Sequence, residues 1–346
     1  MILNKITFQN VNDVSILLFV RIPNTMMTRP DFEKKQIVLV FTMDGEKVSF
    51  QNDNLIVKDS DGKIIHQSTC YRVFALFVIG HITITSGIIE KSHRFGFPIY
   101  LMTSSLRTID IIGHRTDGNT QLRKLQYCRD NEHIAKHIIS NKITNQINTL
   151  KRQRINNWEI KDAIKQLSEI KDQILLKENN PRSLMGLEGN AAKIYFRHNF
   201  DSCHWSGRRP RIKDNMINSI LDIGYTILFN YIDAMLSIYG FDTYCGILHT
   251  QFYMRKSLTC DMVEPFRPLI DWQVRKSINL GQFKEEHFNI SNRRYLLDIR
   301  YNKEYVRTLI KPILGARMEI FLYFQSFYRA FMKNASSTFR VGQQFF

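Results

Sequence analysis

The chain has 346 residues, enough for one large domain or for two of ordinary size. It is 44% hydrophobic and 23% charged, which is typical of a globular protein and excludes an intrinsically disordered chain. No stretch approaches the roughly 18 apolar residues of a membrane span. The apolar run at residues 14–20 is short and lacks a signal-peptide cleavage site, so we expect an intracellular protein.

The positive charge of the chain is unevenly distributed. The formal net charge is +16, from 48 Lys and Arg against 32 Asp and Glu. Residues 1–117 carry a net charge of +2, whereas residues 118–346 carry +14. This asymmetry predicts a polyanionic partner, a nucleic acid, that contacts mainly the second part of the chain. A basic surface that serves only solubility is the alternative.

The first third of the chain is predicted to be rich in β-strands. Strands are expected at residues 36–42, 47–57, 63–66, 73–79, 81–85 and 96–101. The turn Asp59-Ser60-Asp61-Gly62 lies between two of these runs, and Asp-Gly in that position predicts a β-hairpin. A short helix is expected at residues 86–95. Residues 1–34 also contain strand-like runs, which the pattern alone does not place.

The pattern changes near Asp117-Gly118-Asn119, after which apolar residues recur at helical spacing. Helices are predicted at residues 121–151, 159–176, 184–196, 215–239 and 304–332, the last interrupted by Pro312 and Gly315. We therefore expect an α+β protein. Its N-terminal β-rich, β-sandwich-like domain would occupy residues 1–117, and a larger all-α C-terminal domain residues 118–346.

The cysteines do not indicate a structural zinc site or a disulfide framework. The five are scattered without a CxxC pair, and an odd number fits a reducing compartment: Cys70, Cys128, Cys203, Cys245 and Cys260. Cys203 and His204 are adjacent, but no matching second pair follows, so a zinc site is not expected there.

Two stretches carry candidate catalytic side chains. Glu188 lies between Gly186 and Gly189, where small neighbours would let a helix pack closely and leave the carboxylate reachable. Taken alone, it is also compatible with an ordinary surface glutamate. His249 follows the apolar segment Cys245-Gly246-Ile247-Leu248, a position that also suits a hydrogen-bonded core histidine.

Downstream of the histidine, Asp261 and Glu264 are spaced i, i+3 and would share one face of a helix. Their repulsion would be relieved by a bound cation or by Arg255 and Arg267 nearby, and an ion-paired helix start is the alternative. One imidazole with two or three carboxylates can bind a hard divalent metal. In a strongly basic protein, the natural substrate of such a site is nucleic acid.

Together these stretches resemble a known family, the CRISPR-associated integrases that capture new spacers, called Cas one. Gly186-x-Glu188-Gly189 resembles the first metal-ligand motif of the family, and Gly246-Ile247-Leu248-His249 is similar to its Gly-Phe-Leu-His element. The run from Ser257 to Glu264, followed by Phe266-Arg267-Pro268 and Asp271, resembles its Ser-Leu to Phe-Arg-Pro block. Lys142, Asn145 and Gln146 fit its Lys-Ile-x-Asn-Gln element.

The resemblance implies a metal site formed by Glu188, His249 and Glu264, with Asp261 as an acidic neighbour that lines it. Mg²⁺ or Mn²⁺ suits this ligand set, and the histidine favours Mn²⁺. The implied reaction is transesterification, in which the 3′-hydroxyl of a captured DNA fragment attacks a phosphodiester at the border of a repeat array. Metal-dependent endonuclease activity is the corresponding hydrolysis.

The resemblance also implies partners: double-stranded DNA, a second copy of the chain joined through the β-rich domain, and a small Cas two protein that bridges two dimers. A prokaryotic cytoplasm follows from the family. The loop containing Arg208 to Lys213 lies beside Trp205, and basic side chains beside an aromatic ring are typical of a DNA-contacting surface. A solvated loop is the alternative. The side chains predicted to contact DNA are Lys193, Arg197, Arg208, Arg209, Arg211, Arg255, Lys256 and Arg267.

The chain departs from the family pattern before Ser257, where Met254-Arg255-Lys256 stands in place of Gly-Arg-Pro. The arginine is kept but the loop glycine is not, so the local backbone could differ. The long N-terminal extension is similar to that of some type V relatives. Two other functions stay open: a catalytically silent DNA-binding scaffold, and a transposon-type integrase or structure-selective nuclease that shares this domain.

Overall fold

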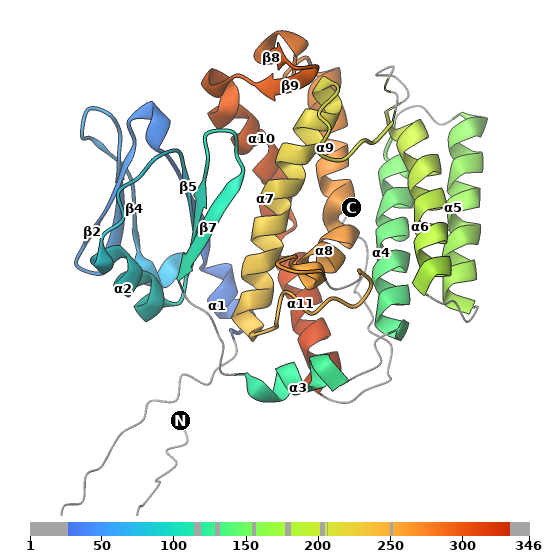
Figure 1. Cartoon of the computed structure of the whole chain (residues 1–346), viewed down its shortest axis with the longest axis horizontal. Coiled ribbons are helices and arrows are strands. Elements are labelled where there is room, and N and C mark those ends of the chain that lie inside the picture. The colour runs from blue at the N-terminus through green and yellow to red at the C-terminus, as the bar shows by residue number, and fades with distance from the viewer. Residues whose placement is uncertain are drawn as a thin grey trace, which may run out of the picture.

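The computed structural model describes residues 27–113, 119–128, 132–153, 157–176, 181–200, 205, 207–249 and 252–332. The predictions made for residues 1–26 and for Cys203 and His204 lie outside the described residues. A β-rich part comes first and a helical part follows, as Figure 1 shows, which confirms the predicted fold class. Among the described helices, none has the length and apolar character needed to cross a lipid bilayer.

The larger sheet of the β-rich part has four strands in the order β1-β5-β6-β7. Their bounds are Gln36–Phe41, Val73–Ile79, Pro98–Met102 and Thr108–Gly113. β1, β5 and β6 are parallel, and β7 joins β6 in antiparallel register. Every residue of β5 is buried, as its continuous apolar run predicts for a central parallel strand.

The second sheet is antiparallel and consists of β2 (Lys47–Gln51), β3 (Asn54–Lys58) and β4 (Ile64–Thr69). β3 and β4 form the predicted hairpin, and the Asp59 side chain accepts hydrogen bonds from the N–H groups of Asp61 and Lys63 in its turn. The single strand predicted at 47–57 is wrong, because the chain turns at Asn52, which has φ 54°. Apolar side chains between the sheets form a separate core, which includes Val38, Leu55 and Leu76.

The strand predicted at residues 81–85 is absent, and this segment has no regular structure. Gly80, at φ 110°, turns the chain out of the sheet at the end of β5. The alternation that suggested a strand comes from Ile82 and Ile84, and the partly buried side chain of Ile82 packs against the core between the two sheets. Helix α2 (Ser86–Phe95) then follows as predicted, after the short α1 (Arg29–Glu33) near the start of the described chain.

The described helices pack around two apolar cores. The helices are α3 (Thr120–Cys128), α4 (Glu132–Lys151), α5 (Trp158–Leu176), α6 (Pro181–Asn199), α7 (Met216–Tyr239), α8 (Ser257–Val263), α9 (Arg267–Asn279), α10 (Asn302–Gly315) and α11 (Arg317–Met332). The single helix predicted at 121–151 is two helices. α4, α5 and α6 lie side by side around their own apolar core, away from the sheets (Figure 1).

A β-hairpin interrupts the helical part and was not predicted. Its strands are β8 (Phe288–Ser291) and β9 (Arg294–Leu297), paired antiparallel between α9 and α10. Both turn residues, Asn292 and Arg293, have positive φ, 51° and 58°, as a tight hairpin turn requires. The turn lacks a glycine, so its sequence carries little of the usual hairpin signal.

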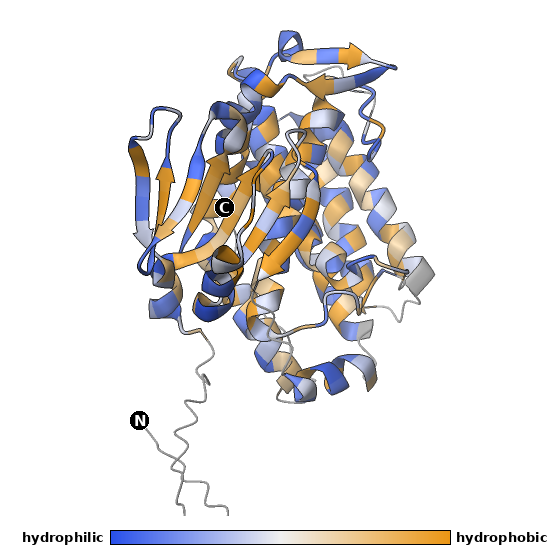
Figure 2. Ribbon diagram, turned by 60° about the vertical axis from the view of Figure 1, so that its left-hand side comes forward, coloured by the Kyte–Doolittle hydropathy of each residue, from blue (hydrophilic) through white to orange (hydrophobic). Residues whose placement is uncertain are grey.

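The central helix α7 connects the two parts of the molecule. It begins at the N-cap Asn215, ends before Gly240 at φ 81°, and is buried along most of its length. The core around it includes residues of β5 and β6 as well as of α9, α10 and α11. Figure 2 shows the strands of the larger sheet to be largely hydrophobic. The two parts therefore share one continuous core.

Close packing of α7 on α9 gives a prediction for Gly224. A Cβ at this position would lie 2.4 Å from Cγ2 of Ile270, and overpacking of this kind costs about 1–3 kcal/mol. We expect Gly224→Ala to lower the free energy of unfolding, measured by urea denaturation, although alanine is the better helix former.

Gly189→Ala in α6 is the matched control, because a Cβ there meets no atom within 4 Å. This variant should gain up to about 1 kcal/mol from helix propensity alone. Equal unfolding midpoints for the two variants would show that the α7–α9 contact is not tight.

Candidate functional site

The loop before α8 is built around the buried carboxylate of Asp261. Oδ2 accepts hydrogen bonds from the N–H groups of Ile247 at 2.6 Å and Leu248 at 2.9 Å, and Oδ1 accepts one from the N–H of His249 at 3.0 Å. Oδ1 also lies 2.5 Å from Nδ1 of His249. Because this contact occupies Nδ1, Nε2 is the ring nitrogen left for a ligand.

Gly246 allows the loop to fold closely around the Asp261 carboxylate. A Cβ there would lie 2.6 Å from Cβ of Ser257 and 3.2 Å from Oδ2 of Asp261. The glycine of the Gly-Ile-Leu-His element therefore allows the loop to approach the first turn of α8 closely. By contrast, Gly186 and Gly189 beside Glu188 face open space, so the close helix packing predicted for them is wrong.

Glu188 and Glu264 converge on one cation, the ammonium group of Lys142. Glu264 begins the short 3-10 turn η4 (Glu264–Phe266) directly after α8, and its Oε2 lies 2.6 Å from Nζ of Lys142. The same Nζ contacts Oε1 of Glu188 on α6. Oε1 of Glu264 lies 3.0 Å from Nη2 of Arg267. Three helices and one turn thus bring two carboxylates and two cations together.

The charges of this group determine the ionisation of its members. Burial alone would raise the pKa of Glu264, but Arg267 and Lys142 outweigh burial and lower this pKa to about 2. His249 contributes in the same direction, so its ring lies within electrostatic reach of Glu264. Burial would lower the pKa of Lys142, but Glu264 and Glu188 together raise it. The carboxylate of Glu264 is therefore ionised at neutral pH, and Lys142 is protonated.

The structure brings the predicted metal ligands into one region without assembling a complete site. Within the described parts of the chain, no three His, Cys, Asp or Glu side chains are close enough to hold a metal ion as they stand. Lys142 lies between the two carboxylates instead. The sequence pattern had singled out this lysine as part of a motif but had assigned it no role, because nothing in the sequence indicates its partners.

Four of the predicted DNA-binding side chains pair with carboxylates of the protein itself; Arg209 does so in the exposed loop before α7, and the other three are less exposed. Arg267 pairs with Glu264, and Nζ of Lys256 lies 3.0 and 2.9 Å from the two oxygens of Asp233 in α7. Nη2 of Arg208 lies 2.5 Å from Oδ1 of Asp222. These contacts fix the loops that carry the basic residues, and DNA binding by the four stays a prediction.

The other predicted DNA contacts lie nearer to solvent. Lys193, Arg197 and Arg211 are exposed, like Arg209, and Arg255 is half-buried. Lys193 and Arg197 follow Glu188 by five and nine residues, which places them about 140° and 180° around α6 from it. Both side chains therefore lie on the far side of α6 from Glu188.

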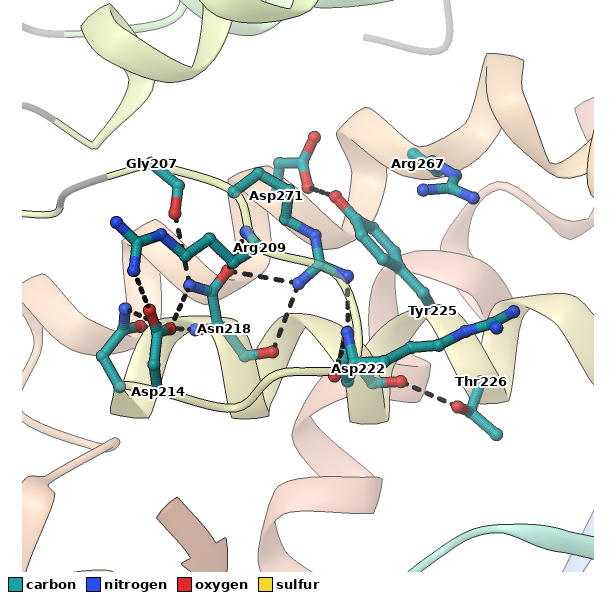
Figure 3. A network of polar contacts seen from close by, with 12 residues as sticks. Gly207, Arg209, Asp214, Asn218, Asp222, Tyr225, Thr226, Arg267 and Asp271 are labelled. Atoms are coloured by element: carbon teal, nitrogen blue, oxygen red, sulfur yellow. Dashed lines mark hydrogen bonds and ion pairs between the residues drawn. The ribbon is translucent and has the colours of Figure 1, made fainter. Parts of the chain in front are cut away.

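The basic loop between α6 and α7 is anchored to the interior by the polar network in Figure 3. Arg209 pairs with Asp214, and Asn218 accepts hydrogen bonds from the Arg208 side chain and the Arg209 N–H. The expected aromatic neighbour, Trp205, packs instead against the rings of Phe196 and Phe200. The ring of Trp205 is therefore partly buried, and a DNA-contacting surface formed with the basic residues stays a prediction.

A buried tyrosine links this network to the carboxylates. The guanidinium groups of Arg208 and Arg267 lie 5.2 and 4.7 Å from the ring centre of Tyr225, whose hydroxyl donates to Asp271 (Figure 3). Burial raises the pKa of Asp271 to about 6, although the hydrogen bond from Tyr225 acts in the opposite direction. Nothing in the sequence had identified Tyr225, because its partners come from two other segments, the loop before α7 and helix α9.

The comparisons with known proteins agree on one family. The model of the CRISPR associated protein Cas1 family matches residues 39–311. The chain is 26% identical over 262 residues to CRISPR-associated endonuclease Cas1 4 of Methanospirillum hungatei, which covers 71% of this chain and 72% of that protein.

Solved structures show the same fold. A chain of a Cas6-RT-Cas1–Cas2 complex matches with a TM-score of 0.75 and 25% identity, over 90% of this chain and 36% of that longer chain. A CAS1 protein from Thermotoga maritima matches with a TM-score of 0.70 and 17% identity, over 86% and 96% of the two chains.

The raised pKa of Asp271 predicts a specific pH dependence of stability. Its ordinary value is 3.8, so folding favours the protonated carboxyl. The stabilising contribution is complete below about pH 4 and is lost as the pH rises through about 6. Asn cannot ionise, so the free energy of unfolding of Asp271→Asn, relative to wild type, should rise by up to about 3 kcal/mol between about pH 4 and about pH 7.

Urea denaturation at several pH values measures this difference. Asp172→Asn, on the exposed side of α5, is the matched control and should show no such trend. A difference between wild type and Asp271→Asn that stays constant with pH would contradict the raised pKa.

Proposed function

The chain belongs to the Cas1 family of CRISPR-associated proteins, and on this premise we propose that it is a DNA integrase and endonuclease of CRISPR adaptation. The observation that supports this most directly is the convergence of Glu188 and Glu264 on one cation, next to a histidine oriented by Asp261. These are the residues at which the sequence resembles the metal-ligand motifs of the family.

The donor set fits a hard divalent ion. The two carboxylates already converge on one cation, and the Asp261 contact leaves Nε2 of His249 for a metal. The fit requires the ammonium of Lys142 to move aside. Mg²⁺ or Mn²⁺ bound by Glu188, His249 and Glu264 would lower the pKa of the attacking hydroxyl and offset charge on the phosphate.

The proposed reaction exchanges one phosphodiester for another. The 3′-oxygen of a captured fragment loses its proton and forms a bond to a phosphorus atom at the leader–repeat border. The bond from this phosphorus to the 3′-oxygen of the preceding nucleotide breaks and leaves a new 3′-hydroxyl. When water replaces the attacking hydroxyl, the same site cuts DNA. Arg267, which already pairs with Glu264, is placed to offset charge near the reacting phosphate.

We assign the parts of the chain accordingly. Residues 118–346 would form the catalytic, DNA-binding domain, and residues 1–117 would join two copies of the chain. Lys193 and Arg197 would contact DNA away from the reacting phosphate, since they lie on the far face of α6 from Glu188. A small Cas2 protein would bridge two such dimers, and the matched complex that contains Cas2 supports this assembly.

One observation favours a second candidate, a catalytically silent DNA-binding protein. Lys142 and Arg267 already neutralise both carboxylates without any added ion. If Lys142 cannot be displaced, the chain would bind DNA but would not react with it. Strand transfer distinguishes the two functions.

We expect His249→Ala to lose strand transfer. The assay joins short duplexes with 3′-hydroxyl ends to supercoiled DNA that carries a leader and a repeat, with Mg²⁺ or Mn²⁺ and with Cas2 added. The rate should fall by about 100-fold or more, because the variant lacks a proposed ligand of the metal ion that would stabilise charge in the transition state. His93→Ala, at an exposed position of α2, should react like wild type. If wild type binds DNA but neither joins nor cuts it, the result favours the second candidate, a catalytically silent DNA-binding protein.

We expect Asp261→Asn to weaken Mn²⁺ binding by about 10-fold to 100-fold, because this side chain orients His249. Electron paramagnetic resonance of free Mn²⁺ measures the affinity, and circular dichroism checks the fold. Asp172→Asn is the control for loss of one negative charge. Unchanged affinity in a folded Asp261→Asn variant would show that His249 is not held for a metal by this contact.

A further inference from the structure

Lys142 is a buried cation held by two of the candidate metal ligands. Its side chain, in the middle of α4, is 9% exposed. Nζ contacts Oε1 of Glu188 and lies 2.6 Å from Oε2 of Glu264. A buried ammonium is costly unless carboxylates offset its charge, so these two contacts account for its place in the interior. Because the partners come from α6 and from the turn after α8, one side chain holds together two segments of the site.

The two carboxylates depend on Lys142 in turn. The side chain of Glu264 is 8% exposed, and that of Glu188 is 28% exposed. Oε1 of Glu264 pairs with Arg267, but its buried Oε2 receives no hydrogen bond of good geometry, so the ammonium is what offsets the charge there. Like charges brought together in a protein interior repel strongly. Without Lys142, or another cation in its place, Glu188 and Glu264 would therefore be driven apart.

A divalent metal ion would need the same oxygen atoms. Carboxylate oxygens suit Mg²⁺ and Mn²⁺, and the oxygens that converge here are Oε1 of Glu188 and Oε2 of Glu264. Lys142 already occupies the position between them. Metal ion and ammonium therefore exclude each other, and metal binding is an exchange of one cation for another. Two positive charges replace one, which favours the exchange.

The exchange requires no movement of a helix. Lysine carries its charge on a flexible four-carbon stem, so the ammonium can swing away while the backbone stays in place. Helix α4 itself is held against the site by Asn145, whose side chain donates to the carbonyl of Pro265 at 2.7 Å. Asp261 holds His249 through a separate contact. The side chain of Lys142 is thus the part that has to move when a metal ion enters.

We propose that Lys142 is a positioning residue that keeps Glu188 and Glu264 together in the metal-free protein and competes with the metal ion for them. The inference rests on the proposed function, since the competing ion is the metal ion of that site. It goes further because part of the affinity that the carboxylates and His249 would supply is offset by displacement of the ammonium. The site thus stays assembled without metal and binds metal more weakly than its ligands alone would allow.

The test measures Mn²⁺ affinity by electron paramagnetic resonance, and stability by urea denaturation, in the full chain. We expect Lys142→Met to bind Mn²⁺ about 5-fold to 150-fold more tightly than wild type, the range typical of coupling between two binding events. Metal-free Lys142→Met should unfold at lower urea concentration than wild type, and saturating Mn²⁺ should narrow this gap, because the ion restores the missing positive charge. A lysine with a purely structural role would give the opposite change in affinity, since loss of structure weakens metal binding.

Two control variants separate competition from a general effect of charge. Lys142→Arg keeps a cation between the carboxylates and should bind Mn²⁺ no more tightly than wild type. Lys151→Met removes one positive charge from the exposed end of α4, about 14 Å along the helix from Lys142, and should change the affinity by less than about 2-fold. Circular dichroism checks the fold of each variant.

A measurement on the wild type covers the case in which Lys142→Met does not fold. Nuclear magnetic resonance of isotope-labelled lysine ammonium groups follows Lys142 directly, and the signal is assigned by its loss in Lys142→Arg. We expect this signal to shift as Mg²⁺ is added to saturation. The signal of Lys256, which Asp233 holds, should stay constant.

The outcomes separate this inference from the proposed function. If neither wild type nor Lys142→Met binds Mn²⁺, the metal site is wrong and both proposals fall. If wild type binds Mn²⁺ and joins DNA, while a folded Lys142→Met variant binds the ion equally or more weakly, the competing role of Lys142 alone is wrong. An unchanged Lys142 signal in wild type saturated with Mg²⁺ overturns that role in the same way.

Discussion

The buried carboxylate of Asp261 is the interaction on which the candidate site depends. An ionised carboxylate is costly to bury unless its oxygens receive hydrogen bonds, and here three backbone N–H groups and an imidazole supply them. The described residues of the segment between α7 and α8 form no helix or strand. The position of His249 in this segment is set by the Asp261 side chain and by the absence of a Cβ at Gly246.

A second constraint is the balance of charge between Glu188, Glu264, Lys142 and Arg267. Each carboxylate would be unfavourable in the interior alone, and each cation likewise. Lys142 comes from α4, Glu188 from α6 and Arg267 from α9, so the three helices must keep their relative positions to keep these charges paired. Asn145 reinforces the arrangement by donating from α4 to the carbonyl of Pro265 in the turn after Glu264.

The sequence predicted what depends on local burial and missed what depends on distant partners. Helices such as α7 and strands such as β5 were predicted, because the spacing of apolar residues along an element indicates whether it is buried on one face or on both. The alternation at residues 81–85 misled because Ile82 and Ile84 alternate with more polar residues in a segment that belongs to no sheet, where Ile82 packs partly buried against the core. At the site, residue types and spacing indicated Glu188, His249, Asp261 and Glu264. Lys142 acquires its role only through Glu188 and Glu264, 46 and 122 positions away, which no local pattern records.

The same reasoning limits what net charge says about DNA binding. Residues 118–346 carry a net charge of +14, yet Lys142, Arg208, Lys256 and Arg267 all have protein carboxylates as partners. These cations fix loops and helices, and only those that remain at the surface can exchange counterions with DNA. The cationic footprint is therefore smaller than the sequence suggests.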